Sequence, residues 1–163
     1  MFALLRSRSA GVTWGALATD VAFEGSAEVV LRRIEPDALF DLSDHDRVTR
    51  EAARDLDDWS ARGHDLVTVL DPEYPARLLD IKETPPFLFY EGALRATDPG
   101  MSIVGSREAS HEAIELAGAA ARFLVDEGLT VISGLAAGVD TAAHRAALSA
   151  GGRTVAFIGT GIA

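Results

Sequence analysis

Three short segments rich in glycine, serine and threonine carry the residues of this sequence that are best suited to bind an anion. They are Gly105-Ser106-Arg107, the stretch from Ser133 to Asp140, and Gly159-Thr160-Gly161. Glycine lets a backbone approach a ligand closely and present its N–H groups. The guanidinium of Arg107 is a planar, permanently charged fork that matches a pair of phosphate oxygens. These residue types favour a phosphate-bearing ligand.

Each segment also has a simpler interpretation. A glycine after a strand is often only a tight turn, and Ser110 and Asp140 are residue types that cap helices. The convergence of three such segments favours ligand binding over that alternative. The residues predicted to bind phosphate are Gly105, Ser106, Arg107, Ser110, Ser133, Gly134, Gly138, Asp140, Gly159, Thr160 and Gly161.

Asp140 and His144 have the spacing of a metal-binding pair, or of a base and the residue that orients it, because positions i and i+4 share a helix face. No third ligand or nucleophile accompanies them, so a packing or hydrogen-bonding role is favoured. The chain contains no cysteine and lacks the motifs G-x-x-x-x-G-K-[ST], G-x-S-x-G and H-E-x-x-H. The sequence therefore predicts no catalytic residue, no metal site and no cofactor.

Alternating strands and helices would bring the three segments together. Apolar runs at 101–104, 129–132 and 153–158 predict strands, and Ala-rich stretches at 114–127 and 141–150 predict the helices between them. Such strands pair in parallel, and ligands bind at the carboxyl edge of an open parallel sheet. The predicted fold class is α/β, a doubly wound parallel sheet. Only three of the usual five or six strands are present, so the domain is expected to be incomplete.

Residues 1 to about 62 are predicted to be helical. Apolar residues recur at helical spacing from Val48 to Trp59, and Gly63 marks the end of that helix. After Gly63, the apolar runs at 66–70 and 87–90 predict two strands, with a short helix beginning near Pro75. The predicted domains are a helical N-terminal region, 1–62, and a parallel-sheet domain, 63–163.

The net charge of −10 argues against an extended nucleic-acid-binding surface, because such binding depends mostly on phosphate neutralisation. The acidic residues are concentrated in the first part of the chain. Residues 1–100 hold 11 basic and 19 acidic residues, whereas residues 101–163 hold 4 basic and 6 acidic residues. The charge of the second range therefore does not exclude a local basic site. No apolar run approaches the ~20 residues that span a bilayer, and no secretory signal is recognisable. A cytoplasmic location, away from the membrane, is expected.

The motifs of the last third resemble the DNA-processing protein A family (DprA, also called Smf). The resemblance rests on Ile-Val-Gly-Ser-Arg at 103–107, Ser-Gly-Leu-Ala-Ala-Gly-Val-Asp-Thr-Ala-Ala-His at 133–144 and Gly-Gly-Arg-Thr-Val-Ala at 151–156. The segments at 74–79 and 85–92 look like the family's entry segment, so the match runs from about residue 50 to residue 163. The resemblance implies an extended Rossmann-like fold and a cytoplasmic bacterial protein without catalytic turnover.

The resemblance also implies partners. Members of the family bind incoming single-stranded DNA during natural transformation, protect it, and help to load the RecA recombinase onto it. Gly105-Ser106-Arg107 match the family's DNA-contacting turn, and the segments at 133–140 and 159–161 match its second and third turns. Members form homodimers, but the dimer interface and the RecA-contacting surface lie in the part of the domain that this sequence is expected to lack.

An alternative of a different class is a nucleotide-processing enzyme of the related Rossmann-like superfamily that includes lysine-decarboxylase-like phosphoribohydrolases. Those enzymes carry a P-G-G-x-G-T-x-x-E turn whose glutamate does the chemistry. Gly159-Thr160-Gly161 has neither the preceding Pro-Gly-Gly nor the glutamate. Single-stranded DNA binding is therefore favoured, and a remnant whose turns are only turns is the third interpretation.

Overall fold

The structure is a computed structural model that describes residues 12–34 and 42–159. The chain forms two compact units that divide between Thr97 and Asp98. The first unit includes the two strands that the sequence analysis grouped with the second domain. Residues 1–11 and 35–41, which the sequence predicts to be partly helical, lie outside the described residues, as do residues 160–163.

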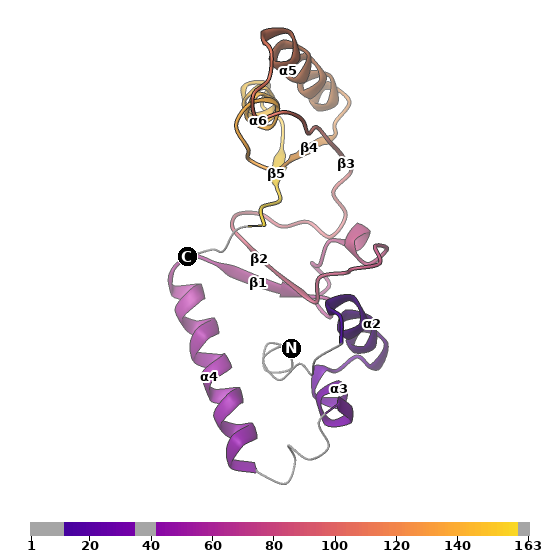
Figure 1. The fold of residues 1–163 in the computed structure, drawn as a ribbon, viewed down its shortest axis with the longest axis vertical. Coiled ribbons are helices and arrows are strands. Elements are labelled where there is room, and N and C mark those ends of the chain that lie inside the picture. The colour runs from indigo at the N-terminus through magenta and orange to yellow at the C-terminus, as the bar shows by residue number, and fades with distance from the viewer. Residues whose placement is uncertain (1–11, 35–41, 160–163) are drawn as a thin grey trace. The chain divides into compact units, whose positions relative to one another are not determined.

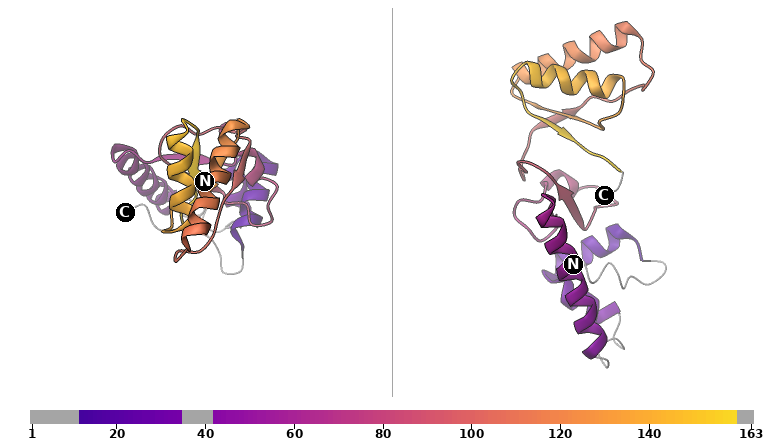
Figure 2. Two further views of the ribbon diagram at one scale, coloured as in Figure 1. Left: turned by 90° about the horizontal axis from the view of Figure 1, so that it is seen from above. Right: turned by 90° about the vertical axis from the view of Figure 1, so that its left-hand side faces the viewer.

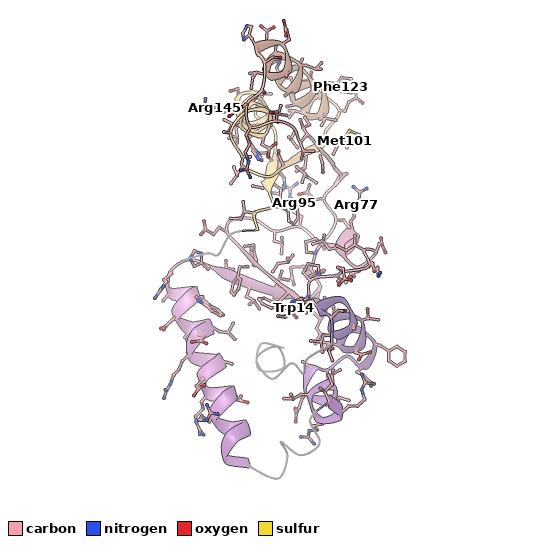
Figure 3. All side chains as sticks on the ribbon, viewed as in Figure 1. Trp14, Arg77, Arg95, Met101, Phe123 and Arg145 are labelled. Carbon is pink, nitrogen blue, oxygen red and sulfur yellow. The ribbon has the colours of Figure 1, made fainter. Side chains whose placement is uncertain are left out.

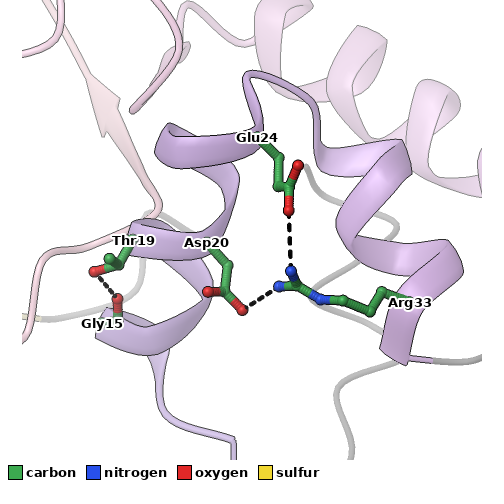
Figure 4. A network of polar contacts seen from close by, with 5 residues as sticks. All are labelled: Gly15, Thr19, Asp20, Glu24 and Arg33. Atoms are coloured by element: carbon green, nitrogen blue, oxygen red, sulfur yellow. Dashed lines mark hydrogen bonds and ion pairs between the residues drawn. The ribbon is translucent and has the colours of Figure 1, made fainter.

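The described part of the first unit begins with two short helices, α2 (Trp14–Glu24) and α3 (Ala27–Ile34). Thr13 starts α2 because its hydroxyl oxygen accepts a hydrogen bond from the Ala16 N–H at 3.1 Å, and Gly25, with φ 66°, ends it. Arg33 of α3 reaches back to Asp20 at 2.6 Å and Glu24 at 3.0 Å (Figure 4). The two helices are therefore joined by exposed ion pairs as well as by packing.

The rest of the described part of the first unit contains one long helix and a two-stranded ribbon. Helix α4 spans Leu42–Ala61, and β1 (Asp65–Thr68) pairs antiparallel with β2 (Phe87–Tyr90) (Figure 1). A single 3-10 turn, η2 (Ala76–Leu78), replaces the short helix expected near Pro75. The core of the unit joins α2 and α3 to the ribbon and contains Leu17, Ala18, Val21, Val30, Val67, Val69 and Tyr74.

The second unit is a three-stranded parallel sheet with two crossover helices. Its elements are β3 (Gly100–Ser102), α5 (His111–Asp126), β4 (Thr130–Ser133), α6 (Val139–Ser149) and β5 (Thr154–Ala156), and the strand order is β3-β4-β5. The predicted α/β class, the parallel pairing and the helical N-terminal region are confirmed.

Both crossover helices cover the same face of this sheet, as Figure 2 shows. Val131 in the central strand is fully buried against small residues of α5 and α6, among them Ala121, Ala143 and Ala147. Small side chains let the two helices pack closely on each other and on the sheet. The arrangement β-α-β-α-β is one half of a doubly wound sheet.

Two helix starts lie earlier in the chain than the sequence predicts. Helix α5 begins at His111 rather than residue 114, because Ser110 caps it by accepting a hydrogen bond from the Ala113 N–H at 3.3 Å. Helix α6 begins at Val139 rather than residue 141, directly after Gly138. The earlier starts bring both helix N-termini close to the turns that the sequence singles out.

Candidate anion-binding site at the carboxyl ends of the parallel strands

The structure brings the ends of the three parallel strands together through hydrogen bonds between the segments that follow them. The buried Ser133 hydroxyl donates to the carbonyl of Ile103 at 2.6 Å, which joins β4 to the end of β3. The Phe157 N–H donates to the Ser133 carbonyl at 2.9 Å, which joins β4 to the end of β5. Ser133 is thus a structural residue at the centre of the edge.

The first turn (residues 105–107) and the second turn (residues 133–140) also contact each other directly, and glycine is needed at that contact. The Val139 N–H donates to the Ser106 carbonyl at 3.2 Å. A Cβ atom on Gly138 would lie 2.2 Å from that carbonyl oxygen, and one on Gly105 would lie 2.8 Å from the side chain of Val139. Gly138 also has φ 82°, which disfavours any residue with a Cβ. Gly105 and Gly138 therefore allow the two turns to meet.

Asp140 holds the second turn from inside. Its side chain is 6% exposed, and its Oδ2 atom accepts hydrogen bonds from the N–H groups of Gly134 at 3.2 Å and Ala136 at 3.4 Å. The Thr141 hydroxyl donates to the Ala136 carbonyl at 2.7 Å and closes the same turn. Two N–H groups of the second turn are thus already used by the protein. Asp140 shapes this turn rather than facing a ligand.

His144 is a second internal residue of α6. Its Nδ1 atom lies 2.6 Å from Thr154 Oγ1, and the Thr154 hydroxyl donates to the Val131 carbonyl at 2.8 Å. Because that hydroxyl hydrogen is used, Nδ1 must carry the proton that links α6 to β5. Asp140 and His144 therefore serve hydrogen-bonding roles, as the sequence analysis favoured. Among the described residues, no three side chains are grouped so that they could hold a metal ion.

The first turn is different, because its donors are unused. Within the described part of the chain, no residue accepts a hydrogen bond from the backbone N–H groups of Gly105, Ser106 or Arg107. The Arg107 side chain is exposed and forms no ion pair with a described residue. Three consecutive free N–H groups beside a guanidinium are suited to bind a phosphate.

The other predicted residues have different roles. One caps a helix, one shapes the first turn, and three belong to the third turn (residues 159–161), which is only partly described. Ser110 caps α5, and its hydroxyl also lies 3.3 Å from the Glu112 carboxylate, so its oxygen is engaged by the protein. The Ser106 hydroxyl oxygen accepts from the Glu108 N–H at 3.1 Å and shapes the first turn. A Cβ atom on Gly159 would meet no described atom within 4 Å, and Thr160 and Gly161 lie outside the described residues.

Sequence reasoning missed the residues that connect the turns. Ile103 and Val139 take part through backbone groups, which leave no signal in residue type, and Thr141 gives only the weak signal of a hydroxyl beside Asp140. It also missed Leu135, whose φ of 58° is the only positive value at a described residue other than glycine. No pattern in the sequence marks a leucine for that conformation.

The second unit also contains a groove. The groove, of about 730 Å³ between β3 and α5, is lined mainly by apolar side chains, including Val104. Met101 and Phe123, which are labelled in Figure 3, also line it. Its lining suits an apolar occupant rather than an anion. No helix in the described ranges is long and apolar enough to cross a bilayer.

Comparison with known proteins assigns the chain to a family. Residues 65–163 match the family described as DNA recombination-mediator protein A. The chain belongs to this family. The matched range covers the ribbon of the first unit and the whole of the parallel sheet, and it includes all three segments singled out above.

The chain is similar to bacterial proteins named Smf and DprA. It is 37% identical over 112 residues to "Protein Smf" of Synechocystis, covering 66% of this chain and 28% of that protein. It is 44% identical over 96 residues to "DNA processing protein DprA" of Streptococcus pneumoniae, covering 58% of this chain and 34% of that one. The chain thus spans about a third of the length of the curated relatives it matches.

The fold also matches a solved structure. The X-ray structure of DNA processing protein A (DprA) from Streptococcus pneumoniae has a TM-score of 0.57 with 38% sequence identity. The match covers 71% of this chain and 42% of that chain. The family expected from the motifs is therefore confirmed both in sequence and in structure.

Proposed function

We propose that this chain contributes a binding site for single-stranded DNA, without sequence preference, to a protein that processes incoming DNA in natural transformation. The site holds backbone phosphates through the first turn, which runs from Gly105 to Arg107. The family membership supports a DNA-processing role, since the matched family is described as a recombination mediator. A site that recognises phosphates alone reads no base sequence.

One observation carries the proposal. The backbone N–H groups of Gly105, Ser106 and Arg107 have no acceptor among the described residues, and the adjacent guanidinium is exposed and has no carboxylate partner there. All three residues are exposed, so their N–H groups are accessible to a phosphate ligand. The second turn, which is held from inside by Asp140, supports the first turn through the contact between Gly138 and Ser106.

The charge of the second unit limits how the site works. Residues 101–163 contain 4 basic residues, so the contact surface is small and local rather than an extended basic groove. Glu108 and Glu112 lie close to the first turn in sequence and oppose the field of Arg107. We therefore expect weak binding that depends strongly on Arg107 and on salt.

The function assigned here is binding and protection without catalysis. Asp140 binds two backbone N–H groups and the Nδ1 atom of His144 binds Thr154, whereas the buried Nε2 atom of His144 has no partner among the described residues. We further propose that the strand held here is passed to the RecA recombinase and that the protein acts as a homodimer in the cytoplasm. These partner roles extend the family resemblance to this chain.

Fluorescence anisotropy with a labelled 20-nucleotide dT strand tests the phosphate site. Arg107→Ala should weaken binding about tenfold, as expected for the loss of a charged hydrogen-bonding contact. It should also make the dependence of log K on log salt shallower by about one unit in slope. The matched control is Arg122→Ala, because Arg122 is also exposed but lies well along α5, away from its N-terminus. An unchanged slope in Arg107→Ala would remove Arg107 from the contact set.

A further inference from the structure

We draw no further inference here: the strongest candidate, the mainly apolar groove between β3 and α5, lies along the edge strand of one half of a doubly wound sheet, and nothing in the described residues shows what covers it.

Discussion

Gly138→Ala should separate the two turns that form the site, and its cost can be worked out from the contacts. The new Cβ atom would lie 2.2 Å from the Ser106 carbonyl oxygen and 2.7 Å from the Arg107 carbonyl oxygen. Both are backbone atoms, so no side chain can turn away to relieve the clash. The backbone of Gly138, with φ 82° and ψ −126°, adds strain for any residue with a Cβ.

These terms predict a loss of about 3 kcal/mol in the free energy of unfolding of the second unit. Strain in a sparsely populated backbone region costs on the order of 1–3 kcal/mol. Loss of the Val139 to Ser106 hydrogen bond, which is 3.2 Å long, adds about 1 kcal/mol. Gly151→Ala is the matched control, because Gly151 also has positive φ, 72°, but a Cβ there meets nothing within 4 Å. The control should cost only about 1 kcal/mol.

Hydrogen exchange resolved to peptides from residues 98–159 is the appropriate assay. Both tryptophans, Trp14 and Trp59, lie in the first unit, so tryptophan fluorescence does not report on the second. We expect loss of protection at Val139 in Gly138→Ala, together with weaker binding of a dT strand. Equal stability of Gly138→Ala and Gly151→Ala, to within about 0.5 kcal/mol, would refute the reasoning from the turn contact.

Two further predictions concern buried groups in the two units. In the first unit, burial raises the pKa of Tyr74 from 10.0 to about 12, and its hydroxyl donates to the Pro85 carbonyl at 2.6 Å. Because the folded pKa lies above the unfolded one, the contribution of Tyr74 to stability is complete below pH 10 and is lost as the pH rises toward 12. Urea unfolding followed by tryptophan fluorescence should show this loss in wild type and a smaller one in Tyr74→Phe; identical pH profiles would contradict it. In the second unit, Thr154→Val removes the partner of His144 Nδ1 and a hydrogen bond to the Val131 carbonyl. Leaving the buried Nδ1–H without an acceptor should cost about 2 kcal/mol by hydrogen exchange, and a cost below about 0.5 kcal/mol would show that the ring finds another partner.

The order and type of the elements in the second unit could be predicted because the signals are local. Apolar runs separated by Ala-rich stretches predicted the parallel strands and the helices between them, and the structure has β3, α5, β4, α6 and β5 in that order. The predicted positions at which the helices begin were less accurate. The start of α6 depends on the backbone of Gly138, whose conformation is decided by its contact with the first turn and not by nearby sequence.

The sequence identified the segments of the candidate site but not the separate roles of their residues. Glycine, serine and arginine types alone suggested that all three turns face a ligand. In the structure, Ser133 and Asp140 are buried and engaged by backbone groups, whereas the donors of Gly105, Ser106 and Arg107 find no acceptor in the described ranges. Residue type does not reveal which hydrogen-bonding groups the protein itself will use.

What the sequence determined by itself is the α/β pattern, the glycine-rich turns at one edge of the sheet and, through their motifs, the family. These follow from periodicity and from ordered residue types, which act over short distances along the chain. Only the tertiary structure decided that the second turn supports the first and that Leu135 lies exposed in a left-handed conformation. The reason is physical: these features depend on contacts between residues about 30 positions apart, such as Ser106 with Val139 and Ile103 with Ser133, which form only when the strands pair.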